Sequence, residues 1–206
     1  MSKQDVEHFE RVLTAPYIHL EGGGSYFVER DGPVLRLFFE GSNGRLDWRN
    51  NFDFPAKPYR DMADRWYAHR GFLRVWKEIE PRVADQIADP TVAIVEVVGY
   101  SHGAAVALLC HEYVRFHRPD VMALGTGYGC PRVVWGWLSK KVRERFKGFY
   151  VVRNGRDLVT HLPPALFGYR HEGLMIETGR SVGPIKDHSP EAYKAALQEW
   201  VEEVLD

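Results

Sequence analysis

The residues most able to do chemistry lie in the pattern Gly99-Tyr100-Ser101-His102-Gly103. A β-branched apolar run, residues 92–98, precedes it, and an alanine-rich pattern typical of a helix follows at once. In this strand–turn–helix setting, Gly-x-Ser-x-Gly is typical of a nucleophile elbow, and glycine at both flanks avoids collisions with the neighbouring strand and helix. The sequence therefore predicts Ser101 as a nucleophile and the amide of His102 as part of an oxyanion hole. The alternative is a glycine-rich turn in which the serine is incidental.

A serine hydroxyl also needs a general base to take its proton, and the base usually needs a carboxylate to orient it. Where a sheet carries such an elbow, the chain order is serine, then an acid, then histidine. Asp157 fits this order because it follows an expected strand, residues 149–153, and a turn. Asp120 precedes a strand and so lies at the wrong end of it. Asp187 is next to a histidine in the sequence, and adjacent side chains rarely face one another for a shared hydrogen bond. We expect Asp157 to be the acid.

Four histidines compete for the role of base: His102, His161, His171 and His188. His102 is inside the elbow, where its amide matters more than its ring. His161 lies in a Leu-Pro-Pro loop close to Asp157, and His171 begins a strand-like run. His188 lies in a loop before the final helix, from which a base can reach over the sheet edge. Order and placement favour His188, with His171 and His161 left as alternatives, and for any one of them a purely structural role competes.

Hydrophobic periodicity predicts the elements that position these residues. The expected helices cover residues 2–13, 72–87 (with a kink or restart at Pro81), 102–117, 133–146 and 191–205. The expected strands cover residues 25–29, 34–39, 92–98, 121–124, 149–153 and 173–177. A polar, aromatic-rich loop region covers residues 41–69. Strands that alternate with helices predict an α/β fold with a mostly parallel central sheet flanked by helices, and a site at the carboxyl ends of its strands.

Length and composition limit the class of protein. The 206 residues suit one domain over residues 1–206, and a net charge of −1 argues against a nucleic-acid partner held by bulk electrostatics. Glycine-rich residues 21–25 and 125–129 lack the lysine of a P-loop and the dinucleotide spacing, and Cys110 and Cys130 have no metal-type spacing, so we expect no cofactor and no metal. With neither an apolar signal segment nor a membrane span visible, we expect a cytoplasmic protein without stable membrane insertion. The oligomeric state is left open.

Beyond the elbow, separated blocks follow one another in a characteristic order: Phe38-Phe-Glu-Gly-Ser42, Asp47-Trp48, Ala68-His-Arg-Gly-Phe72, Gly129-Cys-Pro-Arg-Val133, Asp157-Leu-Val-Thr-His-Leu-Pro-Pro164, Tyr169-Arg-His-Glu-Gly173, and Asp187-His188 followed by Tyr193. In this order the blocks resemble the class 3 lipases, a family of fungal triacylglycerol lipases and feruloyl esterases. The resemblance covers most of the chain.

The resemblance implies an α/β-hydrolase fold and a carboxylic-ester hydrolase that works through an acyl-enzyme on a small-molecule ester. It implies Ser101 as nucleophile, Asp157 as acid and His188 as base, with His171 in a supporting position. It also implies that Ser42 joins the amide of His102 in the oxyanion hole. His69 and Arg132 would buttress the site by hydrogen bonds.

Departures from the family pattern bear on the choice of substrate. Glu40 stands where an arginine is usual, and His102 stands where a leucine is usual, which puts a titratable ring near the cleft. Residues 43–54 match the family's lid but alternate apolar and charged side chains, so they form no continuous apolar stripe. This pattern favours an esterase for soluble or modestly apolar esters over an interfacial lipase. A phospholipase A1 or other acyl hydrolase, or a non-catalytic binding domain that kept the fold, are the alternatives.

Two aromatic pairs, Trp135 with Trp137 and Trp66 with Tyr67, are candidates for lining an acyl or aromatic pocket. Packing is the competing and commoner role for such residues.

Overall fold

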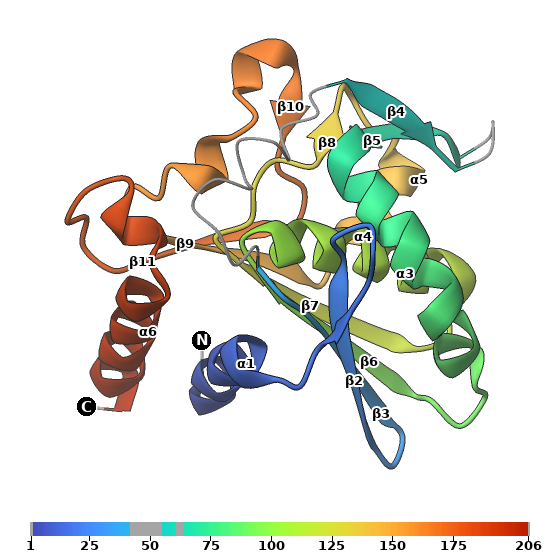
Figure 1. Cartoon of the computed structure of the whole chain (residues 1–206), viewed down its shortest axis with the longest axis horizontal. Coiled ribbons are helices and arrows are strands. Elements are labelled where there is room, and N and C mark those ends of the chain that lie inside the picture. The colour runs from blue at the N-terminus through green and yellow to red at the C-terminus, as the bar shows by residue number, and fades with distance from the viewer. Residues whose placement is uncertain (1, 42–54, 61–63, 206) are drawn as a thin grey trace.

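A mostly parallel sheet forms the centre of the molecule in a computed structural model that describes residues 2–41, 55–60 and 64–205 (Figure 1). Its seven strands follow the order β1-β2-β3-β6-β7-β9-β11. Every neighbouring pair from β3 to β11 is parallel, and only β1–β2 and β2–β3 are antiparallel. The expected sheet is confirmed. Its strands are β1 (Ile18–His19), β2 (Ser25–Asp31), β3 (Val34–Phe39), β6 (Ile94–Tyr100), β7 (Met122–Tyr128), β9 (Phe149–Asn154) and β11 (Leu174–Thr178).

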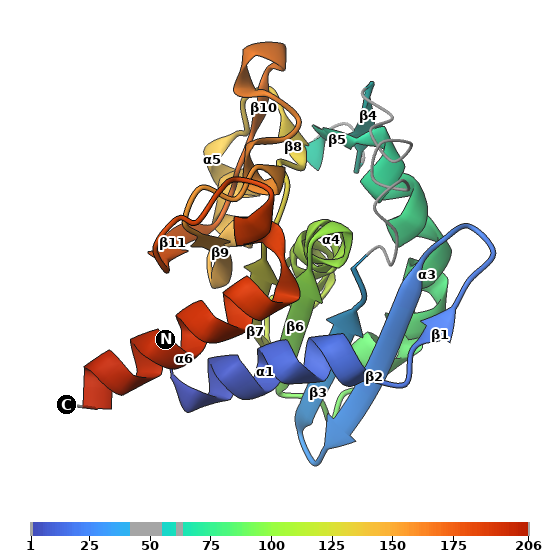
Figure 2. The ribbon, with the colours of Figure 1, turned by 60° about the vertical axis from the view of Figure 1, so that its left-hand side comes forward.

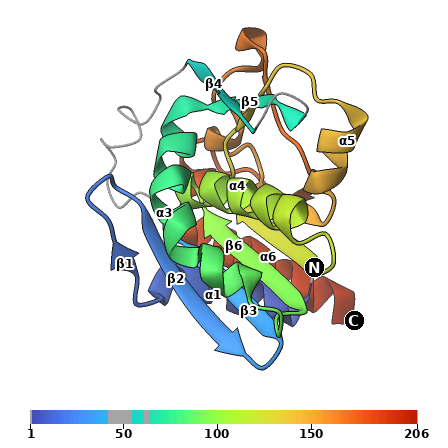
Figure 3. The same cartoon turned by 90° about the vertical axis from the view of Figure 1, so that its right-hand side faces the viewer.

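Helices cover both faces of this sheet (Figures 2 and 3). One face carries α3 (Arg70–Ala88) and α4 (His102–His117), and the other carries α1 (Lys3–Thr14) and α6 (Pro190–Leu205), which lie side by side. The alternation of side chains along a strand sends Leu37 toward one buried cluster and its neighbour Phe38 toward the other. The chain therefore builds two apolar cores, one on each face of the sheet.

The start of α1 and the interior of α3 show how local sequence sets these elements. Ser2 and Asp5 form a reciprocal capping box at the start of α1, and the apolar face of the helix buries Phe9 and Val12. The expected restart at Pro81 does not occur, because α3 continues through it. Pro81 is exposed, so the carbonyl that loses its helical partner there can be solvated. No helix in the described part of the chain is long and apolar enough to span a membrane.

A second, antiparallel sheet follows the order β10-β8-β5-β4 and corrects two expectations. Residues expected to be a loop form β4 (Ala56–Tyr59) and β5 (Trp66–His69), and the expected helix over 133–146 is wrong. That stretch holds the two-residue strand β8 (Val134–Trp135), the short helix α5 (Lys140–Arg143) and a 3-10 turn, η2 (Glu144–Phe146); β10 (Tyr169–Arg170) completes the sheet. Gly136, with a φ of +76°, interrupts any helix there, and pairing of β8 with β5 outweighs helical propensity.

Buried charges fasten this small sheet to α4. Glu112 of α4 is fully buried and accepts hydrogen bonds from Arg60 after β4 (2.6 Å) and from Arg145 (3.0 Å). Both guanidinium groups also lie 4.5 Å from the ring of Phe116. A buried carboxylate needs such partners to offset its desolvation. Glu112 thus links α4 to η2 and to the residue that follows β4. The organisation of residues 1–206 as one domain stays a prediction.

Candidate active site

The turn between β6 and α4 carries Ser101 in a strained conformation, with φ 54° and ψ −121°. A Cβ at Gly99 would lie 2.3 Å from the carbonyl oxygen of Gly103, and one at Gly103 would lie 2.2 Å from that of Phe39. The two glycines are therefore required by close approach to the helix start and to the neighbouring strand, as the pattern predicts. The Ser101 amide donates to the carbonyl of Tyr128 at 2.8 Å, which pins the turn to β7.

Three side chains from distant parts of the chain meet at this turn. The Oγ hydroxyl of Ser101 donates to Nε2 of His188 at 2.9 Å, and Nδ1 of His188 donates to Oδ2 of Asp157 at 2.8 Å. Asp157 is fully buried in the loop after β9, and the His188 side chain, in the turn η5 (Lys186–His188), is 20% exposed. The structure thus brings together the serine, acid and base that sequence order favours, in a geometry that can activate a serine hydroxyl.

Two further donors fix the Asp157 carboxylate. The hydroxyl of Tyr193, on α6, donates to Oδ2 at 2.7 Å, and the amide of Val159 donates to Oδ1 at 2.8 Å. Burial, reinforced by the nearby Asp157 charge, raises the pKa of the Tyr193 hydroxyl well above its usual value, so this group stays protonated. Sequence reasoning used Tyr193 only as a mark of resemblance, and its contact with Asp157 is visible only in the fold.

Asp187 holds the loop that carries His188. Its Oδ2 accepts from Ser181 Oγ (2.6 Å) and the Arg156 amide (2.8 Å), and its Oδ1 accepts from the amides of Val182 (2.8 Å) and Gly183 (3.1 Å). Burial alone would raise the pKa of this carboxyl, but hydrogen bonds from Ser181 and the three amides lower it below its ordinary value. It is Asp157 and not Asp187 that hydrogen-bonds to the His188 imidazole, as the sequence argument expects. Sequence reasoning did not predict that Asp187 holds this loop.

The competing histidines lie in other settings. His171 shares a hydrogen bond of 2.7 Å with the carbonyl of Thr160, and burial lowers its pKa to about 4. The carbonyl of His161 accepts a bond from the Arg132 guanidinium, which also donates to Pro163 at 3.0 Å. Arg132 thereby ties the β7–β8 connection to the loop after Asp157, a buttressing role like the one expected. His69 is likewise buried, stacked 4.2 Å from Phe72.

The expected oxyanion hole is only partly within the described residues. Helix α4 begins at His102, so the His102 amide is one of the first four amides, which have no partner inside the helix, and it lies at the positive end of the helix dipole. Ser42 and the lid-like residues 43–54 lie outside the described residues. Gly41 lies against the elbow, since a Cβ there would be 2.9 Å from the ring of Tyr100. The oxyanion hole stays a prediction.

The His102 ring packs edge-on against Phe72, with 5.4 Å between ring centroids, and burial lowers its pKa to about 4. The titratable ring expected near the cleft is therefore uncharged at neutral pH. Of the aromatic residues expected to line a pocket, Trp66 is 2% exposed and packs against Phe146, which assigns it to the core. Trp137 is instead 83% exposed, beneath the guanidinium of Arg170. A pocket role for Tyr67, Trp135 and Trp137 stays a prediction.

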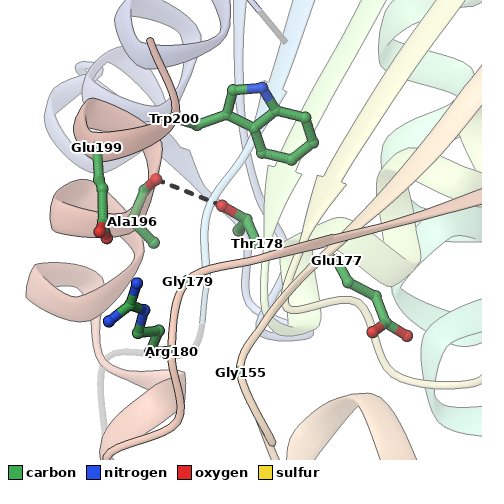
Figure 4. A pocket seen from close by; sticks show the side chains of 8 residues that line it. All are labelled: Gly155, Glu177, Thr178, Gly179, Arg180, Ala196, Glu199 and Trp200. Carbon is green, nitrogen blue, oxygen red and sulfur yellow. Dashed lines mark hydrogen bonds between the residues drawn. The ribbon is translucent and has the colours of Figure 1, made fainter. Parts of the chain in front are cut away.

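A cavity of about 390 Å³ lies elsewhere, between the end of β11 and α6 (Figure 4). The Thr178 hydroxyl donates to the Ala196 carbonyl at 3.3 Å in its wall, and neither Ser101 nor His188 lines it. It is therefore not where a substrate of the triad would bind. Its lining residues are Gly155, Glu177, Thr178, Gly179, Arg180, Ala196, Glu199 and Trp200.

Solved lipase structures share this fold. A lipase from Rhizopus microsporus var. chinensis superposes with a TM-score of 0.69 and 21% identity, over 85% of this chain and 73% of its own. The Rhizomucor miehei triacylglyceride lipase gives the same TM-score and identity, over 85% of this chain and 79% of its own. At such identities the likeness speaks for the fold alone, and the expected α/β-hydrolase fold is confirmed.

Curated relatives are similar in sequence as well. The secreted mono- and diacylglycerol lipase 1 of Fusarium solani is 31% identical over 81% of this chain and 51% of its own length. The lipase of Rhizomucor miehei is 30% identical over 68% of this chain and 40% of its own. The chain thus spans about half the length of these relatives or less. Two relatives from Malassezia globosa are also named secreted lipases, so the expectation of a cytoplasmic location is wrong.

The family pattern agrees with these similarities. The model of the family described as Lipase (class 3) matches residues 36–167, a range that includes the elbow and Asp157. This match covers well over half of the chain and confirms the resemblance seen in the separated blocks. The chain belongs to the class 3 lipase family.

Proposed function

We propose that this protein hydrolyses carboxylic esters through a covalent acyl-enzyme formed on Ser101. The observation that carries the proposal is the hydrogen-bonded chain from Ser101 to His188 (2.9 Å) and on to Asp157 (2.8 Å). A nucleophile, a base and an orienting carboxylate within hydrogen-bond reach are the combination that activates a serine hydroxyl. Membership of the class 3 lipases supports the same reaction.

In the first half-reaction, His188 Nε2 takes the proton of Ser101 as Oγ bonds to the ester carbonyl carbon. The buried Asp157 carboxylate stabilises the imidazolium, and the His102 amide is expected to stabilise the oxyanion. The carbon–oxygen bond to the alcohol then breaks, and His188 gives its proton to the leaving alcohol. In the second half-reaction, water loses a proton to His188 as its oxygen bonds to the acyl carbon. The bond from that carbon to Ser101 Oγ then breaks, His188 returns the proton to Oγ, and the carboxylic acid leaves.

We infer a small-molecule acyl ester as substrate, with no nucleic-acid partner and no stable membrane insertion. Relatives named mono- and diacylglycerol lipases make acylglycerols the first natural class to test. The alternation of apolar and charged residues over 43–54 favours soluble or modestly apolar esters, because burying those charges in lipid would cost desolvation energy.

The test is a hydrolysis profile over p-nitrophenyl esters of increasing acyl length, monoacylglycerol, emulsified long-chain triglyceride and a diacyl phospholipid, with S101A as control. We expect simple saturation on short-chain esters, weak action on the emulsion and no jump in rate at the solubility limit. A clear jump in rate at the solubility limit would show that the protein is an interfacial lipase. Faster release of fatty acid from a diacyl phospholipid than from acylglycerols would favour the phospholipase A1 alternative.

A fluorophosphonate probe separates the enzyme from a binding domain that kept the fold. The wild-type protein should be labelled covalently and S101A should not, because the probe reacts with an activated serine. An unlabelled wild-type protein that also hydrolyses no ester would contradict the proposed function.

A further inference from the structure

Tyr100, the residue before Ser101, contacts His188 at two places. Its ring lies nearly parallel to the imidazole, with 5.2 Å between centroids and 18° between planes. Its hydroxyl donates a hydrogen bond to the backbone carbonyl of His188. The phenol therefore touches both the side chain and the main chain of the residue that we assign as base.

The surroundings of Tyr100 hold it in this position. It is buried, and the rings of Phe9 and Tyr193 meet it edge-on at centroid distances of 5.7 and 5.9 Å. Gly41 also lies against its ring, since a Cβ added to Gly41 would be 2.9 Å from a ring carbon of Tyr100. Burial raises the pKa of the Tyr100 hydroxyl far above its usual value, so the group remains a donor wherever the enzyme is folded.

We propose that Tyr100 is a positioning residue for His188: its hydroxyl fixes the backbone of η5, and its ring supports the imidazole and stabilises the imidazolium. The inference rests on the proposed function. A cation within about 6 Å of an aromatic face is attracted to it, the more so where little water competes. The His188 side chain is only 20% exposed, so water solvates the transient imidazolium poorly.

The other groups that face the imidazole have different tasks. Asp157 accepts from Nδ1, and Ser101 donates to Nε2. Tyr193, from α6, meets it edge-on, with centroids 6.4 Å apart and planes at 88°. Among the described residues, Tyr100 is the aromatic side chain stacked nearly parallel to the imidazole. Its removal is therefore expected to alter proton transfer while the Asp157 hydrogen bond remains.

Two substitutions separate the two contacts. Y100F removes the hydroxyl and keeps the ring, and Y100L removes both. The matched control is Y17F. The Tyr17 hydroxyl also donates to a backbone carbonyl, that of Val12 at 2.7 Å, and Tyr17 packs against the same apolar cluster. For each variant, kcat, KM, the pH profile of kcat/KM and the thermal midpoint are measured.

We expect Y100F to lower kcat about three- to tenfold, with KM and the acidic limb of the profile unchanged, the effect of one lost hydrogen bond. Y100L should lower kcat about 30- to 100-fold and move the acidic limb to lower pH by about half a unit to one unit, because the charged imidazole loses its aromatic neighbour. Y17F should keep kcat within about twofold of wild type, since its lost bond lies on α1.

The proposal is overturned if Y100F and Y100L both keep kcat within twofold of wild type and leave the acidic limb in place. Should Y100L not fold, the pair Y100F and Y17F decides, because only the former is expected to lose activity. If the wild-type protein hydrolyses no ester, the proposed function fails independently. The protonation midpoint of the His188 ring, followed by NMR in wild type and Y100L, then tests the ring contact without turnover, and equal midpoints would contradict it.

Discussion

Replacement of Asp187 by asparagine tests how firmly the fold holds the base. The carboxylate accepts four hydrogen bonds, two at each oxygen. Asparagine offers one acceptor oxygen, so two of those bonds are lost and its amide N–H groups face donors. A hydrogen bond to a charged group contributes about 1.5–3 kcal/mol, so the loss of two is expected to lower the free energy of unfolding of D187N by about 3–6 kcal/mol.

Thermal unfolding at pH 7 measures this cost. For a chain of this size, 1 kcal/mol moves the Tm by about 2–4 °C, so the midpoint should fall by about 6–24 °C. D120N is the matched control, because Asp120 accepts from Arg118 at 2.8 Å but its side chain is 62% exposed. A surface ion pair is worth about 1 kcal/mol at most, so D120N should lower the Tm by no more than about 4 °C.

The difference in stability between wild type and D187N should depend on pH. The folded-state pKa of Asp187 lies below its ordinary value of 3.8, so its stabilisation is complete above that value and is lost as pH falls through the folded-state pKa. The gap between wild type and D187N is therefore expected to be constant from pH 7 to about pH 5 and to narrow below pH 4. A Tm within 2 °C of wild type at pH 7, or a gap that does not narrow in acid, would refute the reasoning.

Other predictions concern the elbow and the base. S101A should abolish ester hydrolysis, by about 10⁴-fold or more in kcat, with little change in Tm, and single-turnover and melting assays would check both. H188A should lower kcat as much as S101A does, and the double variant should be no worse than either single variant. H171A should lower the Tm rather than kcat. An inactive but folded H171A would mean that His171, and not His188, is the base. G103A should unfold the protein or lower its free energy of unfolding by about 3 kcal/mol or more in urea titration, because the new Cβ would lie 2.2 Å from the Phe39 carbonyl oxygen.

The parts of the fold that sequence reasoning predicted are those whose signals are local. The elbow combines a β-branched apolar run, two glycines and an alanine-rich helix within about twenty residues, and β6 and α4 lie where these patterns predict. Asp157 followed from chain order and from its placement after a strand. Order and placement only favoured His188 over His171 and His161, and the resemblance to the class 3 lipases decided for it. The meeting of Asp157 and His188 with Ser101 agrees with that argument, and their catalytic roles stay predictions.

The small sheet could not be predicted, because its signals are not local. Strands β8 and β10 have two residues each, too short to show any period. Trp135 pairs with Tyr67 on one side and Tyr169 on the other, and both partners are distant in sequence. The apolar spacing over 133–146 also fits a helix, so only the pairing and the positive φ of Gly136 decide against one.

The residues that contact the triad and its loop could not be predicted either, because these contacts also join residues far apart in the sequence. Tyr100 meets the carbonyl of His188 across 88 residues, and the Arg156 amide meets Asp187 across 31. Adjacency to His188 counted against Asp187 as the acid, and the same adjacency lets Asp187 hold the base by gathering backbone amides. Residues that act through their neighbours leave no pattern of their own in the sequence.

The strain at Ser101 can persist because its surroundings leave the turn no alternative. The Ser101 amide bonds to Tyr128, its carbonyl accepts from Ala104 at 3.0 Å, and Gly99 and Gly103 pack backbone against backbone. A non-glycine residue in this conformation costs about 1–3 kcal/mol, an amount that these two hydrogen bonds, at about 0.5–1.5 kcal/mol each, can offset. The same turn sets Tyr100 beneath His188, so one strained residue fixes the direction of the nucleophile and the support of its base together.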